Sequence, residues 1–292
     1  MPSRARARDV AARAARPRAT PAAAVASEAK RGPRRQAITR SRLSDWLGPV
    51  ARESGAEIAT IGAFVYRRRR YEIPRIRLAG PYAGHDPIRL ALFAGLHGDE
   101  PAGCLALVWL AAALAEHPER IAGYELSIYP VVNPVGYERD VRFNGAGLDL
   151  NREFWSNSPE AEVRALEAEL RAQRFDGIVT LHSDDTCEGV YGYTHGRTLN
   201  EALLAPALRA ASEVLPPDAR AKIDGFAAQG GLICDCFRGI LSAPPDQKPQ
   251  PFDVIFETPA HAPLDRQVAA TLAAVESILT RYPAFIAYGQ DL

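Results

Sequence analysis

Residues 88–101 read IRLALFAGLHGDEP, and this stretch decides the fold. Its first eight residues, 88–95, form a compact apolar run, which is typical of a strand buried on both faces of a sheet. A histidine and two acids follow, and Pro101 then suits the first turn of an apolar helix expected over 102–115. A buried strand that leads through a polar turn into a helix is half of a strand–helix–strand unit, so the stretch predicts an α/β protein.

The segments on either side of this stretch continue the alternation of strands and helices. Upstream, two strands are predicted, and the arginine run 67–70 joins them as a solvated turn. The predicted strands are 58–66, 71–78, 124–132, 178–182 and 252–257, and the predicted helices are 159–173, 199–214 and 264–281. This order predicts a single α/β domain over residues 43–292, with a central mixed, mostly parallel sheet flanked by helices.

The first forty residues differ in composition from the rest of the chain. Residues 1–40 are rich in Ala, Arg, Pro and Ser and show no apolar periodicity, so we expect a disordered tail. An arginine-rich start also resembles a targeting segment, and an overlong start of translation is a third interpretation.

Charge and hydropathy exclude several classes of function. The 292-residue chain has 35 basic and 35 acidic residues, and because the basic excess lies at the N-terminus, the remainder is net acidic. We therefore expect no nucleic-acid partner. No apolar run approaches the roughly 18–20 residues of a membrane helix, so we expect no membrane partner and a cytoplasmic location. Four cysteines at irregular spacing are expected to be reduced thiols, and nothing in the sequence indicates the oligomeric state.

Polar residues gather where the predicted strands end. His97, Asp99 and Glu100 follow one strand, and Asn133, His182 and Glu257 each lie at the end of another. In open α/β sheets, binding sites form outside the carboxyl ends of the strands. We therefore expect these side chains to meet at one edge of the sheet.

Three of these residues have the chemistry of a catalytic zinc site, which needs three protein ligands and an open position. His97 and Glu100 are three residues apart, so one tight turn can direct both toward a single ion. The third ligand must come from elsewhere, and His182 at the end of its strand is the best placed. The remaining histidines fall in loops and turns. The sequence therefore predicts one Zn²⁺ bound by His97, Glu100 and His182.

Several short blocks carry a resemblance to a known family. The blocks, in chain order, are 97–100 (HGDE), 133–136 (NPVG), Arg142, 149–152 (DLNR), 181–183 (LHS) and 256–258 (FET). In this order they resemble the zinc carboxypeptidases, the carboxypeptidase A-like metallopeptidases, in a short bacterial branch similar to murein peptide amidases. More distantly, they are similar to succinylglutamate desuccinylase and aspartoacylase. The resemblance covers about residues 88–257.

The resemblance implies a role for each block. His97, Glu100 and His182 would bind zinc, and Asp149 would accept a hydrogen bond from the free nitrogen of His97. Glu257 would be the general base for the attacking water.

Substrate contacts are implied in the same way. Arg142 would face the oxyanion, and Asn151 and Arg152 would bind a free carboxylate of the substrate. Alternatives stay open: Arg142 could be a surface ion-pair partner while Arg139 faces the oxyanion, and Asn151 could only cap a turn.

Two features depart from the family pattern or go beyond it. Peptide-cleaving members often carry a mobile tyrosine before the catalytic glutamate, but this chain has none between Tyr193 and Tyr282, which favours a small amide substrate. Asp184, Asp185 and Glu188 follow His182 closely. They are either a solvated acidic turn or a pocket for an ammonium group of the substrate.

The sequence thus predicts a zinc-dependent hydrolase that cleaves an amide bond next to a free carboxylate by metal-activated water. Its expected substrate is a small peptide or a peptidoglycan fragment. One alternative is an N-acyl amino-acid deacylase of the succinylglutamate desuccinylase and aspartoacylase type, which would take an acyl-amino-acid substrate. A second alternative is a non-catalytic binding module.

Overall fold

The computed structural model describes residues 56–81, 86–235, 237 and 239–290. The predicted tail, residues 1–40, and the predicted start of the domain at 43 lie outside this part of the chain. Within it, an eight-stranded sheet has the order β1-β2-β4-β3-β5-β10-β6-β9. The strands are β1 (Ala56–Tyr66), β2 (Arg69–Ala79), β3 (Ile88–Ala94), β4 (Tyr124–Tyr129), β5 (Gly177–Asp184), β6 (Tyr191–Thr194), β9 (Leu232–Ile233) and β10 (Phe252–Pro259).

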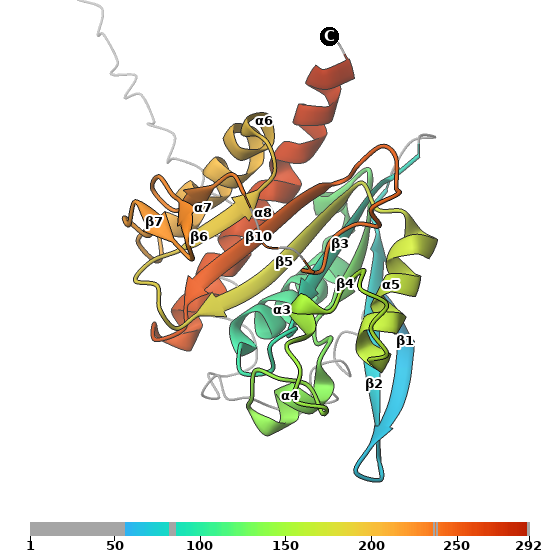
Figure 1. The fold of residues 1–292 in the computed structure, drawn as a ribbon. Coiled ribbons are helices and arrows are strands. Elements are labelled where there is room, and N and C mark those ends of the chain that lie inside the picture. Colours follow the sequence, from blue (N-terminus) through green and yellow to red (C-terminus); the bar gives the residue numbers. More distant parts are fainter. Residues whose placement is uncertain (1–55, 82–85, 236, 238, 291–292) are drawn as a thin grey trace, which may run out of the picture. The chain divides into compact units, whose positions relative to one another are not determined.

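The centre of the sheet is parallel and its flanks are mixed. β3 pairs in parallel with β4 and β5, and β5 pairs in parallel with β10. β1, β2 and β6 join in antiparallel pairs (Figure 1). The prediction of an α/β domain with a mixed, mostly parallel sheet is confirmed.

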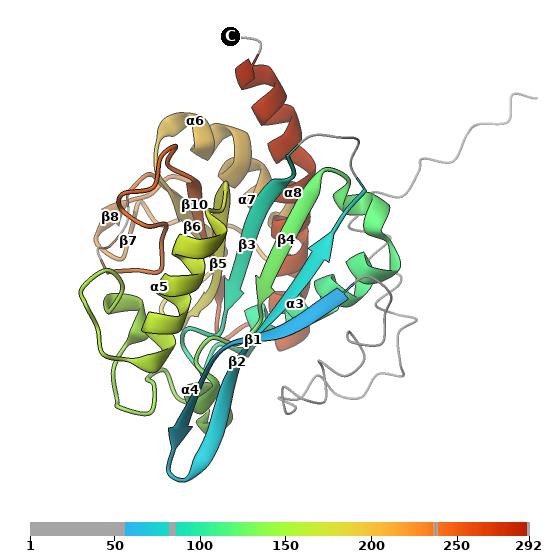
Figure 2. The same cartoon turned by 90° about the vertical axis from the view of Figure 1, so that its right-hand side faces the viewer.

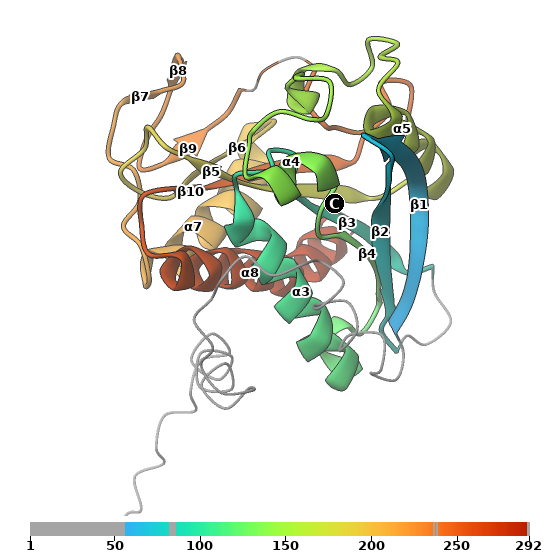
Figure 3. The same cartoon turned by 90° about the horizontal axis from the view of Figure 1, so that it is seen from below.

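Helices cover both faces of the sheet. α3 (Pro101–Glu116), α7 (Ala205–Ser212) and α8 (Leu264–Gln290) lie on one face, and α5 (Ala161–Gln173) lies on the other (Figures 2 and 3). The apolar central strands fit this arrangement, since strands covered on both faces have no polar side to present to water. Phe93 of β3 stacks on Tyr129 of β4 with ring centroids 4.4 Å apart, inside the core under α5.

Shorter elements fill the connections between these layers. They are α4 (Pro134–Arg139), α6 (Arg197–Leu199), the two-stranded sheet of β7 (Lys222–Ile223) and β8 (Phe226–Ala227), the 3₁₀ turns Pro118–Ile121 and Leu150–Arg152, and the π-helical turn Asn200–Leu204. In place of the single helix predicted over 199–214, the chain forms three consecutive segments: α6, the π turn and α7. A π-helical turn contains one residue more than an α-helical turn, and the spacing of apolar residues does not reveal this difference. The sequence therefore did not predict the π turn.

The predicted arginine-rich connection proves to be a tight hairpin. β1 and β2 pair from Ala56 to Tyr66, and the two-residue turn places Arg67 at φ 46° and Arg68 at φ 68°. Positive φ at both positions is characteristic of the hairpin turn whose twist matches that of the strands. Among the described residues, no helix combines the length and apolar character needed to cross a bilayer.

The parallel strands bring the predicted site residues to one edge. His97 follows β3, His182 lies near the end of β5, and Glu257 pairs with His182 in the ladder between β5 and β10. Parallel neighbours end at the same edge, so residues 85 positions apart in the chain, such as His97 and His182, become neighbours.

Candidate metal centre

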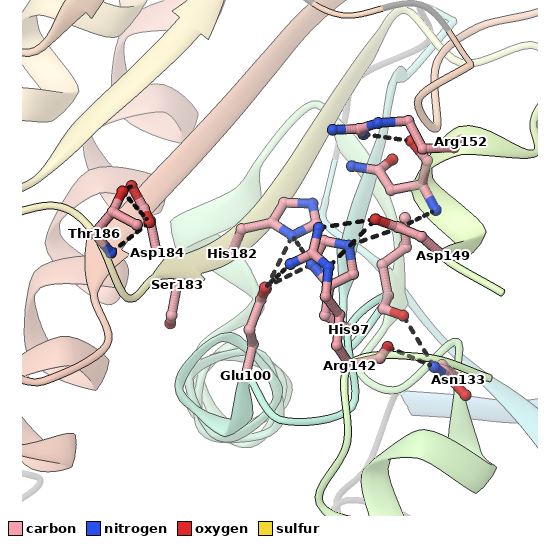
Figure 4. Close-up of polar contacts among 12 residues, drawn as sticks. His97, Glu100, Asn133, Arg142, Asp149, Arg152, His182, Ser183, Asp184 and Thr186 are labelled. Carbon is pink, nitrogen blue, oxygen red and sulfur yellow. Dashed lines mark hydrogen bonds and ion pairs between the residues drawn. The ribbon is translucent and has the colours of Figure 1, made fainter. Parts of the chain in front are cut away.

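Three side chains converge at this edge of the sheet (Figure 4). His97 Nδ1 lies 2.5 Å from Glu100 Oε1, and His182 Nδ1 lies 2.9 Å from Glu100 Oε2. The two Nδ1 atoms are 3.2 Å apart. All three residues are buried, and one ligand atom from each lies within 4.8 Å of the others.

The turn that carries His97 and Glu100 depends on close backbone contacts. Gly95 has φ +66°, a conformation that glycine adopts without strain. A Cβ added at Gly98 would lie 1.9 Å from the carbonyl carbon of Gly136 in α4, so no side chain fits there. The chain thus passes directly over α4, and this contact fixes where His97 and Glu100 point.

The side chain of Asn133 holds the same turn in place through hydrogen bonds. Its side-chain oxygen accepts a hydrogen bond from the backbone N–H of Gly136 and so caps α4. Its side-chain nitrogen donates to the carbonyl of Leu96 at 3.1 Å and to that of Arg142 at 3.4 Å. Because Asn133 is fully buried, it acts as a rigid link between the His97 turn and the loop of Arg142.

The donor set fits a divalent metal ion. Two imidazole nitrogens and a carboxylate are a usual hydrolytic zinc set. The two Nδ1 atoms face each other, and at most one hydrogen fits between them, so a cation at this point satisfies both lone pairs and the carboxylate together. Burial alone would lower the pKa of His97, but the carboxylates of Glu100 and Asp149 outweigh it and raise that pKa to about 9. Burial instead lowers the pKa of His182, so the attraction for positive charge is centred on His97 and Glu100.

Asp149 lies behind His97, on the side away from Glu100. Its Oδ1 is 3.0 Å from His97 Nε2, and its Oδ2 accepts hydrogen bonds from Arg142 Nη2 at 2.9 Å and Nε at 3.3 Å. Burial would raise the pKa of Asp149, but His97 and Arg142 hold it well below its usual range. An ionised carboxylate on Nε2 leaves the Nδ1 lone pair of His97 free to bind a metal.

Arg142 is oriented by Asp149 and remains partly exposed. Its Nη1 lies 3.6 Å from Glu100 Oε1, and the side chain borders the cavity in front of the three ligands. Arg139, the alternative for the oxyanion, donates to the hydroxyl of Tyr66 at 3.2 Å and stacks on that ring, and it is not part of the cavity wall. The structure thus places Arg142 in the site and Arg139 outside it.

Glu257 borders the same cavity next to the ligands. It pairs with His182 on one side of β10 and with Tyr191 on the other. Burial, followed by the carboxylates of Glu100, Asp184 and Asp224, raises the pKa of Glu257 well above its usual value. A carboxylate with a raised pKa beside a cation site is a suitable general base.

Asn151 and Arg152 also reach the cavity, from the 3₁₀ turn Leu150–Arg152. The side-chain oxygen of Asn151 accepts a hydrogen bond from the backbone of Leu241, so this residue also anchors a neighbouring loop. The guanidinium of Arg152 lies over the ring of Phe237, 4.7 Å from its centroid.

The cavity has a volume of about 600 Å³ and includes residues that the sequence did not single out. Tyr191, Tyr193 and Asp224 line it beside Asp184 and Asp185, whereas Glu188 does not. Tyr191 and Tyr193 belong to the short strand β6, and Asp224 belongs to the turn between β7 and β8. Neither element has a periodic pattern long enough to be recognised, so no sequence signal was available.

Comparisons with known proteins agree with this geometry. The chain matches the family of the succinylglutamate desuccinylase/aspartoacylase catalytic domain over residues 86–213. The match includes the three metal-site residues and Asp149, and it ends before Glu257. No curated protein sequence matches the chain.

Solved structures share the fold. A candidate metallopeptidase from Shewanella amazonensis SB2B superposes with a TM-score of 0.67 at 24% identity, covering 82% of this chain and 93% of that one. A metallo-carboxypeptidase from Burkholderia cenocepacia gives 0.66 at 18% identity, over 83% and 68% of the two chains. A succinylglutamate desuccinylase/aspartoacylase from Rhodobacter sphaeroides gives 0.51 at 17%, over 77% and 64%.

The fold and the site therefore define a metallo-carboxypeptidase-like hydrolase fold with a His–Glu–His site suited to a metal ion. The resemblance to zinc carboxypeptidases and to the succinylglutamate desuccinylase/aspartoacylase group, inferred from short sequence blocks, is confirmed.

Proposed function

We propose that this protein is a zinc-dependent hydrolase that cleaves an amide bond next to a free carboxylate, in a small peptide or peptidoglycan fragment. One observation carries the proposal. The buried cluster of His97, Glu100 and His182 opens into the same cavity as Glu257, Arg142 and Arg152. This arrangement supports the proposed roles, because the candidate ligands His97 and Glu100 line the same cavity as the candidate base and arginines.

His97, Glu100 and His182 would hold the metal. When bound, a Zn²⁺ ion supplies Lewis acidity and lowers the pKa of a water molecule toward about 7. Glu257 takes the proton from the attacking water and passes it to the leaving nitrogen. Asp149 keeps the proton of His97 on Nε2, so that Nδ1 stays a donor to the metal.

The arginines orient the substrate and stabilise charge. Arg142, held by Asp149, presents Nη1 to the cavity, where it faces the oxygen that becomes negative as the carbonyl is attacked. Arg152 and the side-chain nitrogen of Asn151 bind the free carboxylate, since a guanidinium matches the geometry of a carboxylate.

An N-acyl amino-acid deacylase is the second candidate. The match to the succinylglutamate desuccinylase/aspartoacylase catalytic domain favours it, and the same machinery would cleave a small acyl amide. A binding module without catalysis is the third candidate, and the placement of Glu257 and Arg142 in the cavity beside His97 and Glu100 argues against it.

The decisive experiment compares the wild-type protein with Glu257→Gln, which keeps the size of the side chain. Both are purified, loaded with Zn²⁺ and assayed on a panel of acyl-amino acids, dipeptides and murein tripeptides. We expect one ion per chain in both proteins and a fall in kcat of at least about a hundredfold in the variant, as for loss of a general base. Glu213→Gln, an exposed glutamate outside the cavity, is the matched control and should retain full activity.

Two results would contradict the proposal. If the wild-type protein stays metal-free after Zn²⁺ addition, the three residues do not form a zinc site. If Glu257→Gln turns over every substrate as fast as the wild-type protein, Glu257 is not the general base.

A further inference from the structure

Two hydroxyl side chains follow the site residues at the ends of β5 and β10. Ser183 comes directly after His182, and Thr258 comes directly after Glu257. The two strands pair in parallel, so that His182 lies opposite Glu257 and the two hydroxyl residues lie opposite each other. Because successive side chains of a strand alternate between the two faces of a sheet, both hydroxyls point toward the face that α8 covers (Figure 3).

Gln267, in the first turn of α8, joins the two hydroxyls. Ser183 Oγ lies 3.0 Å from Thr258 Oγ1, and each hydroxyl can donate to Gln267 Oε1 at 3.2 Å. The side-chain nitrogen of Gln267 donates to the carbonyl oxygens of Ala260 at 3.1 Å and Ala262 at 2.7 Å. One side chain thus links the end of β5, the end of β10 and the turn that leads from β10 into α8.

The three side chains of this network are shielded from water. Ser183, Thr258 and Gln267 are all buried, and Thr258 is completely enclosed. Buried hydroxyls and amides cost free energy unless they are hydrogen-bonded, and here each has a partner within the network. A buried polar network whose members are all satisfied makes the surrounding structure rigid.

The network also contacts the metal site through the backbone. Thr258 Oγ1 lies 3.4 Å from the carbonyl oxygen of His182, at the long limit of a hydrogen bond. β5 and β10 both end one residue beyond the hydroxyl pair, and the ends of strands open more readily than their centres. The bonds from the hydroxyl pair to α8 therefore oppose opening of the strand ends that carry His182 and Glu257.

We propose that Gln267 is a positioning residue, which acts through Ser183 and Thr258 to fix the position of Glu257 relative to His182. This inference rests on the proposed hydrolysis, in which Glu257 takes a proton from the attacking water beside the metal ligands. A general base must lie within hydrogen-bond reach of that proton, and a displacement of about 1 Å can lower a rate by roughly a hundredfold. α8 thereby contributes to catalysis although none of its described residues borders the cavity.

The test removes one hydroxyl and keeps the shape of the side chain. Thr258→Val leaves Ser183 paired with Gln267, so both of these side chains keep a partner. With Zn²⁺-loaded protein and the same substrate panel, we expect kcat to fall about tenfold. KM should stay within about twofold of the wild-type value, because the groups proposed to bind the substrate carboxylate are unchanged. Zn²⁺ affinity, measured by competition with a chelator, should fall severalfold because His182 is no longer held.

Thr194→Val is the matched control. The hydroxyl of Thr194 is also buried and also bonds to β10, at the carbonyl oxygen of Asp253 2.8 Å away, but Thr194 does not border the cavity. This variant should lose stability to urea as Thr258→Val does, yet keep the wild-type kcat and Zn²⁺ affinity.

Two further variants assign the effect to the network. Thr258→Ser retains the hydroxyl and should recover most of the kcat that Thr258→Val loses. Gln267→Met keeps the length of the side chain without the amide and should lower kcat as Thr258→Val does. Circular dichroism establishes which variants are folded, and Gln267→Met carries the comparison with Thr194→Val if Thr258→Val does not fold.

The outcomes separate this inference from the function on which it rests. Wild-type kcat and Zn²⁺ affinity in Thr258→Val, or equal losses in Thr258→Val and Thr194→Val, would show that the network stabilises the fold without positioning the site. A Thr258→Ser protein as slow as Thr258→Val would overturn the role of the hydroxyl. Absence of Glu257-dependent turnover in the wild-type protein overturns the proposed function instead, and the Zn²⁺ affinities of the same variants then decide whether the network positions His182.

Discussion

At the scale of single residues, His97 shows how one side chain is held by partners on both sides. Glu100 lies at its Nδ1 and Asp149 at its Nε2. When Nδ1 binds a metal, only the contact between His97 Nε2 and Asp149 can persist unchanged. The Asp149 contact therefore sets the tautomer of His97 and, through it, the affinity of the whole cluster.

Substitution of Asp149 tests this arrangement. Asp149→Asn keeps the shape of the side chain but removes the charge that polarises His97 and holds Arg142. We expect the Zn²⁺ affinity to fall about 10–100-fold, the usual effect of losing such a carboxylate. Competition with a chromophoric chelator measures it.

The control for this measurement is Asp246→Asn, an exposed aspartate paired with Arg171. Its Zn²⁺ affinity should equal that of the wild-type protein. An unchanged affinity in Asp149→Asn would show that His97 binds the metal without help from Asp149.

Residues of the site differed in how far the sequence could predict them. His97 and Glu100 could be predicted because a single turn carries both, and His182 could be predicted because it lies at the end of an apolar strand. Tyr191 and Asp224 could not be predicted, because pairing of β6 with β10 and the small β7–β8 sheet bring them to the cavity. Those contacts form between segments that are far apart in the chain, and a local sequence pattern does not predict such pairing.

At the scale of elements, the site depends on contact between the turn before α3 and the start of α4. Gly98 passes over Gly136 so closely that an added Cβ would lie 1.9 Å from its carbonyl carbon. Contacts under 3 Å require the backbone to move, because no side chain there can give way. The two neighbours of Gly98, His97 and Asp99, would move with it.

Gly98→Ala is therefore expected to impair both stability and metal binding. Displacement of packed backbone typically costs about 1–3 kcal/mol, and the displaced His97 should weaken Zn²⁺ binding at least tenfold. Urea unfolding and chelator competition measure the two effects.

Gly147→Ala provides the comparison for this variant. Gly147 has φ +82° and nothing within 4 Å of an added Cβ, so alanine there incurs only the conformational cost, about 1 kcal/mol. It should bind Zn²⁺ as the wild-type protein does. Equal behaviour of the two variants would mean that the α4 contact does not position the ligands.

At the scale of the whole molecule, the central parallel strands of the sheet could be predicted from the sequence, but the edge formed by β6 and β9 could not. The apolar runs of β3, β5 and β10 are long enough to identify as buried parallel strands, and their polar ends identify the functional edge. β6 and the strands between it and β10 are only two to four residues long, and helices and irregular loops connect them. Such strands are stable only through the contacts they make after folding, so the places of Tyr191, Tyr193 and Asp224 in the cavity wall could not be predicted from the sequence.

Asp253 gives the folded state a distinctive dependence on pH. It lies on β10, where its Oδ1 is buried without a hydrogen-bond partner among the described residues. Burial raises its pKa to about 7, although the backbone of Ala243 donates a hydrogen bond that opposes the shift. An aspartate in an unfolded chain loses its proton near pH 4, so between about pH 4 and 7 the folded state binds more protons than the unfolded state.

The free energy of unfolding should therefore fall as the pH rises through this window, because stability that depends on a proton is lost when the proton leaves. Asp253→Asn cannot ionise, so relative to the wild-type protein it should gain roughly 2–4 kcal/mol between pH 4.5 and pH 8, at about 1.4 kcal/mol for each pKa unit. Urea unfolding at both pH values, with metal-free protein throughout, measures the difference. Asp246→Asn, at an exposed position, should follow the wild-type profile. If Asp253→Asn shows the same change between the two pH values as the wild-type protein, Asp253 does not hold a proton in the folded state.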